Sequence, residues 1–285
     1  MTLIQAILLG IVQGLTEFIP ISSTAHLVLA SRVMSLSLTP EQLTASIAVV
    51  QLGTLLAVIL YFAKDIWNIT IAFIRDHLNV IRRSSGGSPR LSHDAWLGWL
   101  VIIGSIPVGV VGLLFKKQIE GTFTKNLWVI ATMMIVIAVL LAIAEVVSNK
   151  RRGMQDLGIV DSLAVGLAQC LALIPGSSRS GSTIMAGLFV GEAREAAARF
   201  SFLLSMPAIA ASGLLELKQA LHILPHDSLI TLAAGTVVSA IIGYASIWFL
   251  LRFLRTHTTG VFIGYRLIVG IAILVMLLTG RLSPL

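Results

Sequence analysis

The stretch QGLTEFIPISSTAH, residues 13–26, places a carboxylate, a run of hydroxyls and an imidazole inside sequence that is otherwise apolar. An ionisable side chain at bilayer depth costs about 2.5–3.5 kcal/mol on insertion scales, so Glu17 has to face protein, water or a ligand rather than lipid. Pro20 interrupts the stretch, because proline removes a backbone donor and disfavours helix at the residue before it. The segment therefore predicts two short helices that meet at a polar turn.

The composition of the chain indicates an integral membrane protein. Of its 285 residues, 56% are apolar and only 12% are charged, and the mean hydropathy is +0.95. Soluble domains do not have these values. The net charge of +7 comes from Lys and Arg in short clusters between apolar runs, which membrane orientation and anionic lipid explain better than nucleic acid. We therefore expect membrane lipids, and no nucleic acid, among the partners.

The apolar segments fall into two kinds. Two of them, 2–34 and 158–190, are broken at Pro20 and at Pro175-Gly176. Two half-helices joined in this way can enter and leave on one side of the bilayer, provided that the turn is buried in protein or lines a cavity. The predicted fold is all-α, with two re-entrant helix pairs and six transmembrane helices. The six segments long enough to cross are 44–63, 97–115, 127–144, 200–215, 229–251 and 261–280.

The two broken segments resemble each other. Residues 20–24 match residues 175–179 at an offset of 155, which also carries Ser46 onto Ser201, and Gln13 corresponds to Gln169 after a one-residue gap. An internal duplication explains these matches and predicts one transmembrane domain, 1–285, made of repeat one, 1–147, and repeat two, 158–285. A chance match of short Ser-rich strings is the alternative.

Charge in the linkers predicts the orientation. If both broken segments are re-entrant, one face, here called the basic face, carries twelve Lys and Arg residues, and the other carries six. The positive-inside rule makes the basic face cytoplasmic and places both termini outside. The first helix pair then enters from outside and the second from the cytoplasm, which gives interlocked inverted-topology repeats. The linkers of the basic face are 64–96, 148–157, 191–199 and 252–260.

Gln13 and Glu17 are spaced i, i+4, so they share one helix face and can converge on one ion or water. A carboxylate with an amide oxygen beside it suits a hard divalent cation, Mg²⁺ or Ca²⁺, and a Glu in a low dielectric can also become a general base. The alternative is a structural Glu that is hydrogen-bonded across helices.

The residues after the first break offer hydroxyls and an imidazole. Ser22, Ser23 and Thr24 begin the second half-helix, where Ser and Thr are favoured caps. Capping alone is one explanation for them, but a helix start also has free N–H groups and the positive end of the dipole, which bind phosphate. His26 lies three and four residues beyond Ser23 and Ser22, on the same face, and we interpret it as catalytic rather than as a core histidine.

The second break supplies the opposite charge. In PGSSRSGS, residues 175–182, Arg179 lies among Ser178, Ser180 and Gly181 at the next helix start. Arg binds phosphate oxygens bidentately and keeps its charge when desolvated. An ion pair between Arg179 and Glu17 is the structural alternative, and it is compatible with a phosphate clamp. Arg266 is also intramembrane; contact with the site and pairing with a Glu or a backbone carbonyl both remain open.

These two motifs resemble those of a known family. QGLTEFIPISSTAH and PGSSRSGSTI, residues 175–184, are similar to the (Glu or Gln)-x-x-x-Glu and Ser-Ser-Thr-x-His elements and to the PGxSRSG motif of the undecaprenyl pyrophosphate phosphatases of the bacitracin-resistance type. The hydropathy agrees over essentially the whole chain. Matching positions fall on Glu17, Ser22, Ser23, His26, Ser178 and Arg179. Gln13 stands where many relatives have Glu, so more of the metal or base role would fall on Glu17.

The resemblance implies a multi-pass enzyme of the bacterial plasma (inner) membrane. Its reaction would be hydrolysis of a long-chain isoprenyl diphosphate, undecaprenyl diphosphate, to undecaprenyl phosphate and inorganic phosphate. This recycles the lipid carrier for cell-wall synthesis and confers resistance to bacitracin. The resemblance also implies a divalent cation, six crossings with two re-entrant pairs and, in many members, a homodimer.

A mechanism follows from these residues. Mg²⁺ or Ca²⁺ near Glu17 and Gln13 would bridge the diphosphate, while Arg179 and backbone donors hold its oxygens. Either Ser23 or Ser22 attacks after losing its proton to Glu17 or His26, or a water does so with the same base; Ser23 is the preferred nucleophile. The rival hypothesis is a lipid or anion transporter, or flippase, built on the same inverted repeats.

Overall fold

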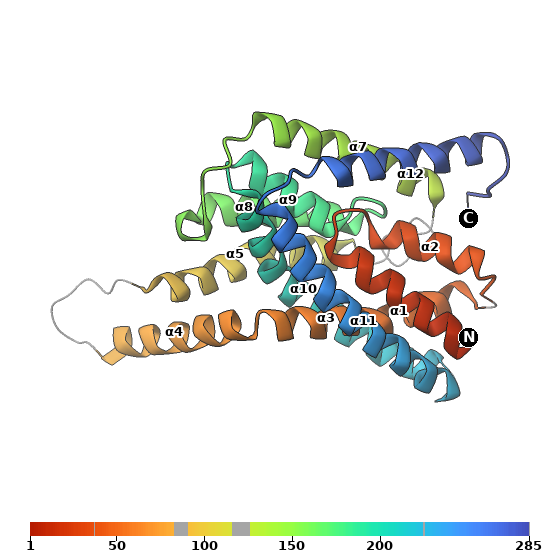
Figure 1. Ribbon diagram of the computed structural model, residues 1–285. Helices are drawn as coiled ribbons and strands as arrows, with labels where there is room; N and C mark the ends of the chain where they lie inside the picture. Colours follow the sequence, from red (N-terminus) through yellow and green to blue (C-terminus); the bar gives the residue numbers. More distant parts are fainter. Residues whose placement is uncertain (37, 83–90, 116–125, 225, 285) are drawn as a thin grey trace.

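A computed structural model describes residues 1–36, 38–82, 91–115, 126–224 and 226–284. Over these ranges the chain is helical and has no strand, in agreement with the predicted all-α class (Figure 1). The α-helices are α1 Leu3–Phe18, α2 Ser23–Val33, α3 Pro40–Tyr61, α4 Ala63–Arg82, α5 His93–Leu114, α7 Leu127–Val147, α8 Ile159–Cys170, α9 Arg179–Phe189, α10 Arg194–Ile223, α11 His226–Leu254 and α12 Gly260–Leu278, and two 3₁₀ turns are η2 Met154–Asp156 and η3 Leu171–Leu173.

Within the described ranges, six helices are long and apolar enough to span a membrane, as predicted, and each overlaps one of the expected segments. They are α3, α5, α7, α10, α11 and α12. The fourth expected segment, 200–215, is short for a crossing, but α10 has 30 residues because helix-favouring residues such as Ala196–Ala198 extend it. Pro207 lies inside α10 without ending it.

Helix α4 continues from α3 after a break at Phe62 and pairs with α5 (Figure 1). Its buried side faces α5, where Trp99 Nε1 donates to His77 Nε2 over 3.0 Å. Its other side exposes apolar residues, including Trp67, which is 68% exposed. Helix α4 therefore has one side buried against α5 and an exposed apolar side.

The shorter helices lie between the long ones. Helix α1 packs on α11 and α3, whereas α8 packs on α5 and α9 packs on α10 and α7. Glycines allow two of these close approaches: a Cβ at Gly10 would lie 2.3 Å from the carbonyl oxygen of Gly235, and a Cβ at Gly166 would lie 2.3 Å from that of Gly104. Helices α1 and α8 thereby each bury one side against a long helix.

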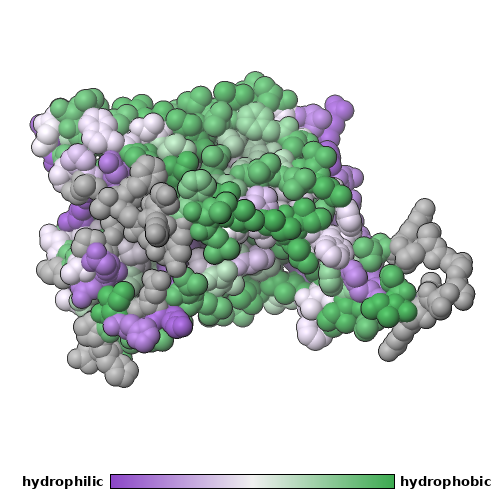
Figure 2. Space-filling model, turned by 180° about the vertical axis from the view of Figure 1, so that it is seen from behind, coloured by the Kyte–Doolittle hydropathy of each residue, from purple (hydrophilic) through white to green (hydrophobic). Residues whose placement is uncertain are grey.

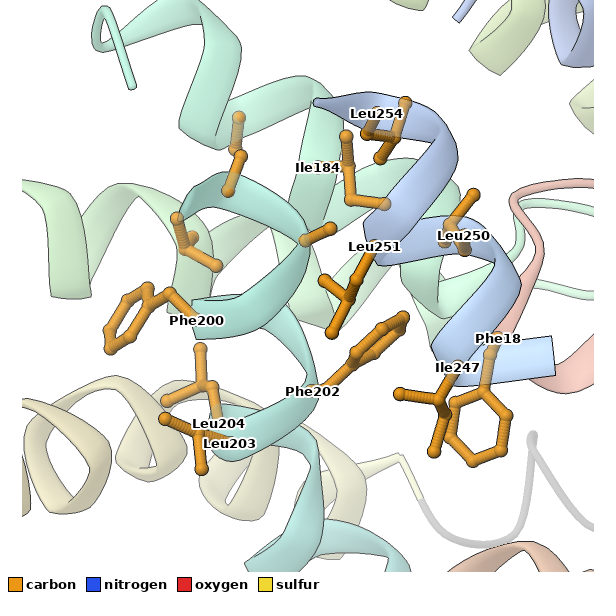
Figure 3. Packing of buried hydrophobic residues seen from close by; sticks show 14 of the residues in the cluster. Phe18, Ile184, Phe200, Phe202, Leu203, Leu204, Ile247, Leu250, Leu251 and Leu254 are labelled. Carbon is orange, nitrogen blue, oxygen red and sulfur yellow. The ribbon is translucent and has the colours of Figure 1, made fainter. Parts of the chain in front are cut away.

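The main apolar core lies beside the end of α1. Phe18 and Phe202 pack edge to face with ring centroids 5.3 Å apart, and Ile184 brings α9 into the same cluster (Figure 3). Since Phe18 follows Glu17 and Ile184 lies on the helix that begins at Arg179, this packing fixes the two polar turns against α10 and α11. The labelled α10 and α11 residues of the cluster are Phe200, Phe202, Leu203, Leu204, Ile247, Leu250, Leu251 and Leu254.

The described parts of the linkers predicted to share the basic face meet at one end of the bundle. The backbones of Arg152 and Glu192 form an isolated parallel β-bridge, Arg194 pairs with Glu145, and the hydroxyl of Thr259 donates to the same carboxylate over 2.8 Å. Both termini lie at the opposite end (Figure 1). Between these ends the surface carries a broad apolar belt with polar side chains on either side, as Figure 2 shows for one face.

Candidate functional site

The first turn is set by Pro20 and Ser22. Helix α1 ends at Phe18, and Ser22 then takes φ 79°, which is left-handed and unusual for a residue with a side chain. The hydroxyl of Ser22 accepts from the backbone N–H of Ala25 over 3.5 Å and caps α2. Ser22 is only 1% exposed. The expected cap is therefore present, at a strained position of the kind that recurs in active sites.

The second turn repeats this arrangement. Gly176 has φ 89°, and a Cβ there would lie 2.2 Å from the carbonyl oxygen of Ile130, so only glycine fits against α7. Ser178 has φ 67° and caps α9 by accepting from the N–H of Gly181 over 3.2 Å. Two non-glycine residues in the same rare conformation thus begin the two half-helices.

The structure corrects the alignment of the two breaks. The sequence match at an offset of 155 pairs Ser22 with Ser177, but the equivalent caps are Ser22 and Ser178. The second turn is one residue longer between its proline and the cap. The corrected offset is therefore one residue larger. It is the same offset that relates Gln13 to Gln169, and it also relates Gly10 to Gly166.

An ion pair joins the two turns. Arg179 Nη2 donates to Glu17 Oε1, and the side chains are 15% and 6% exposed. Gln13 Nε2 donates to Glu17 Oε2 over 3.0 Å and lies 3.4 Å from the hydroxyl of Thr54 on α3. Gln13, Glu17 and Arg179 therefore converge, as predicted. In this structure Arg179 and Glu17 form the ion pair that the sequence offered as the structural alternative to a phosphate clamp.

The serines of the second motif add contacts across the turns. The hydroxyl of Ser180 lies 3.3 Å from the carbonyl oxygen of Ile19 and 3.5 Å from that of Glu17. Ser178 and Ser180 have their hydroxyl oxygens 3.2 Å apart. Because Ser180 and Arg179 both reach α1, the start of α9 lies directly against the end of α1.

His26 forms a second polar group beside the first turn. Its Nδ1 lies 2.7 Å from the carbonyl oxygen of Ser22, and its Nε2 lies 2.7 Å from the hydroxyl of Tyr265 on α12. A carbonyl can only accept, so in the neutral ring Nδ1 carries the proton and Nε2 accepts from Tyr265. The rings also stack, with centroids 5.6 Å apart. Ser23 and Thr24, one turn before His26, are half-buried.

Sequence reasoning missed Tyr265 and Thr54 and left the role of Arg266 open. Tyr265 lies next to an intramembrane arginine in an otherwise apolar helix, which was the available signal. Thr54 is 0% exposed and lies beside Gln13, a contact between α3 and α1 that spacing within one helix cannot indicate. Arg266 is also 0% exposed and donates to backbone carbonyls rather than to a carboxylate.

Oxygen atoms at Glu17 and Gln13 fit a hard divalent cation. Gln13 Oε1 is buried without a hydrogen-bond partner, and it lies on the residue whose amide nitrogen contacts Glu17. Within the described ranges no group of three or more His, Cys, Asp and Glu side chains gathers to bind a metal. This donor set matches Mg²⁺ sites, which use one or two carboxylates and take their other ligands from phosphate and water.

Comparison with known proteins agrees with the motifs. The sequence profile of the family described as "Bacitracin resistance protein BacA" matches residues 6–272. A protein of Syntrophobacter fumaroxidans named "Undecaprenyl-diphosphatase" is 51% identical over 278 residues, which cover 97% of this chain and 98% of the relative. Proteins of the same name from Chlorobium phaeovibrioides and Myxococcus xanthus are each 46% identical to this chain over 100% of its length. The matches span 100% of the first relative and 92% of the second. The chain therefore belongs to the bacitracin resistance protein BacA family.

Proposed function

We propose that this protein hydrolyses undecaprenyl diphosphate to undecaprenyl phosphate and inorganic phosphate in the bacterial plasma membrane, and so recycles a lipid carrier of cell-wall synthesis. One observation carries the proposal: the carboxylate of Glu17 and the guanidinium of Arg179 meet between two hydroxyl-rich turns inside a membrane bundle. Family membership and the names of the relatives support the same reaction. They do not favour the transporter alternative.

The proposed architecture is a pair of interlocked inverted repeats with two re-entrant helix pairs, α1–α2 and α8–α9. Equivalent packing supports it, since α1 meets α11 through Gly10 and Gly235 while α8 meets α5 through Gly166 and Gly104. With the basic face in the cytoplasm, both termini and the first turn would open to the outside. A homodimer remains a prediction, to be checked by the mass of the purified protein in detergent.

Arg179 is the proposed phosphate clamp. Its guanidinium can pass from Glu17 to phosphate oxygens, and the N–H groups at the start of α9 point to the same place. Ser178 and Ser180 supply hydroxyls there, with their oxygens 3.2 Å apart. The negative charge of the diphosphate would thus be neutralised in a water-poor site, which is where most of the acceleration of phosphoryl transfer arises.

Glu17 and Gln13 are the proposed metal ligands. A bound Mg²⁺ or Ca²⁺ would supply charge neutralisation for the terminal phosphate. Glu17 is freed for this role when Arg179 turns to the substrate. Gln13 keeps the carboxylate oriented through its amide N–H and presents Oε1, the buried oxygen without a partner.

Ser23 is the proposed nucleophile. Ser22 is buried and its hydroxyl caps α2, whereas Ser23 is only half-buried and occupies the first position of the helix. In the covalent route Ser23 Oγ bonds to the terminal phosphorus and gives its proton to Glu17, or to His26 Nε2 in place of the hydrogen bond from Tyr265. The bond from phosphorus to the bridging oxygen breaks and releases undecaprenyl phosphate. Water then cleaves the phosphoserine to free phosphate; in the alternative route water attacks the diphosphate directly.

The test is phosphate release from undecaprenyl diphosphate by the purified full chain in detergent. We expect release that a chelator abolishes and that Mg²⁺ or Ca²⁺ restores. Glu17→Gln should be inactive, while Glu195→Gln, a matched carboxylate change at the basic face, should keep activity. A folded wild-type protein that releases no phosphate with either cation would refute the proposal.

A further inference from the structure

Arg266 on α12 contacts both turns of the site. Its Nη1 donates to the carbonyl oxygen of Pro20 over 3.3 Å, and its Nη2 donates to those of Gly176 and Ser177 over 3.0 and 3.1 Å. It also donates to α7, through Nε to Met134 O over 3.1 Å and through Nη2 to Met133 O over 3.3 Å. One fully buried guanidinium therefore joins three segments of the chain.

The chemistry of this contact is specific to arginine. Carbonyls at a helix end or a broken turn have no intrahelical partner, and buried ones need a donor. A guanidinium offers five N–H groups in a rigid planar fork, which fixes the relative positions of the acceptors. An ammonium group is a single point and cannot reach two turns and α7 at once.

The joined carbonyls lie next to the reacting groups. Pro20 is three residues after Glu17, and Ser177 is two residues before Arg179. A Cβ at Gly181 would lie 3.4 Å from Arg266 Nη1, so the guanidinium also lies beneath the start of α9. The carbonyls that Arg266 holds are thus two or three residues from the carboxylate and from the phosphate clamp.

We infer that Arg266 is the positioning residue of this site: it holds the turn that carries Ser22 and Ser23 at a fixed distance from the turn that carries Arg179, so that both act on one diphosphate. The expected effect on catalysis rests on the proposed function. The hydrogen bonds by which Arg266 holds the two turns together are a property of the fold alone. Arg266 acts through the two turns, and its loss should lower kcat more than it raises KM.

The experiment compares Arg266→Met and Arg266→Lys with Arg194→Gln, which removes an arginine that joins α10 to α7 at the basic face. Phosphate release gives kcat and KM, and amide hydrogen exchange reports on the peptides that contain residues 19–24 and 175–180. Small misplacements of reacting groups cost about 100-fold in rate, so we expect kcat to fall about 100-fold in both Arg266 variants, with KM changing less than about threefold.

Exchange should rise at both turns in the two Arg266 variants, and Arg194→Gln should leave kcat and both turns unchanged. If Arg266→Met does not fold, Arg266→Lys decides alone. Full activity in Arg266→Lys would show that charge rather than geometry matters and would overturn the inference. Unchanged exchange at either turn would overturn the claim that Arg266 holds the two turns together. This readout does not need phosphate release, so it applies even if the wild-type protein released no phosphate and the proposed function had failed.

Discussion

Arg179 and Glu17 lie 162 residues apart in the sequence and form a buried ion pair between two capped turns. Each group satisfies the charge of the other, so the site is stable without ligand. A diphosphate competes with Glu17 for the guanidinium and, under the proposed function, leaves the carboxylate free for a cation or a proton. Without substrate, both reactive groups are therefore held in this ion pair.

The pair makes a prediction about stability and activity together. Glu17→Gln and Arg179→Gln should each abolish phosphate release, and each should lower the thermal midpoint, since removing one partner of a buried ion pair costs about 3–5 kcal/mol. The double variant should recover part of the stability, because no charge is left unpaired, but none of the activity. Thermal unfolding and phosphate release in the same detergent check this. A double variant that regains phosphate release would contradict the assigned roles.

The two serines of the first turn can be separated by substitution. Ser22→Gly should keep most of the activity, because glycine adopts φ 79° without strain and replaces a cap at a cost of a few tenths of a kcal/mol. Ser23→Ala should lose phosphate release. Initial rates for the two variants, with trapping of a phosphoryl-enzyme from labelled substrate, decide the point. An inactive, folded Ser22→Gly alongside an active Ser23→Ala would make Ser22 the nucleophile.

Tyr265 should orient His26. Tyr265→Phe keeps the stacked ring but removes the hydroxyl that donates to Nε2, so the imidazole loses one of its two fixed contacts. A neutral hydrogen bond contributes about 1 kcal/mol, so we expect kcat to fall about fivefold to tenfold. In His26→Ala, which removes the whole imidazole, kcat should fall about 100-fold or more if His26 is the base. Equal losses in the two variants would show that Tyr265 takes part in the chemistry itself.

The carboxyl of Glu192 should make the stability of the folded chain depend on pH. It lies in the linker between α9 and α10, and burial, with Asp161 nearby, raises the pKa of its carboxyl from 4.5 to about 8. The folded chain therefore holds a proton that the unfolded chain releases, and stability falls as the pH rises from about 4.5 to about 8, by at most about 1.4 kcal/mol per pH unit. Glu192→Gln should remove this loss.

Thermal midpoints from pH 5 to pH 9 measure the effect. The advantage of Glu192→Gln over the wild type should grow up to about pH 8 and then level off. Glu195→Gln, three residues further along and paired with Arg255, is the control and should follow the wild-type slope. Equal midpoints for the wild type and Glu192→Gln across the range would contradict the assigned protonation of Glu192.

Much of the fold could be read from the sequence, because lipid imposes simple rules on it. Runs of apolar residues had to be helices, and Pro20 and Pro175-Gly176 break two of these runs, whereas Pro207 lies inside α10 without ending it. Lengths were harder: α10 extends well beyond its apolar segment at both ends, because polar and alanine-rich residues continue a helix that hydropathy alone would end. The offset between the breaks was one residue too small, since the loop before Ser178 is longer than the loop before Ser22.

The sequence by itself determined which residues could not face lipid: Glu17, His26 and Arg179 are costly in a bilayer, so their presence in apolar segments marked a site. Only the tertiary structure decided how they meet. It paired Glu17 with Arg179, His26 with Tyr265, and Arg266 with the carbonyls of both turns. These contacts join segments far apart in the chain, and the packing of α1, α9 and α12 sets them, whereas periodicity and spacing report only on neighbours within one helix.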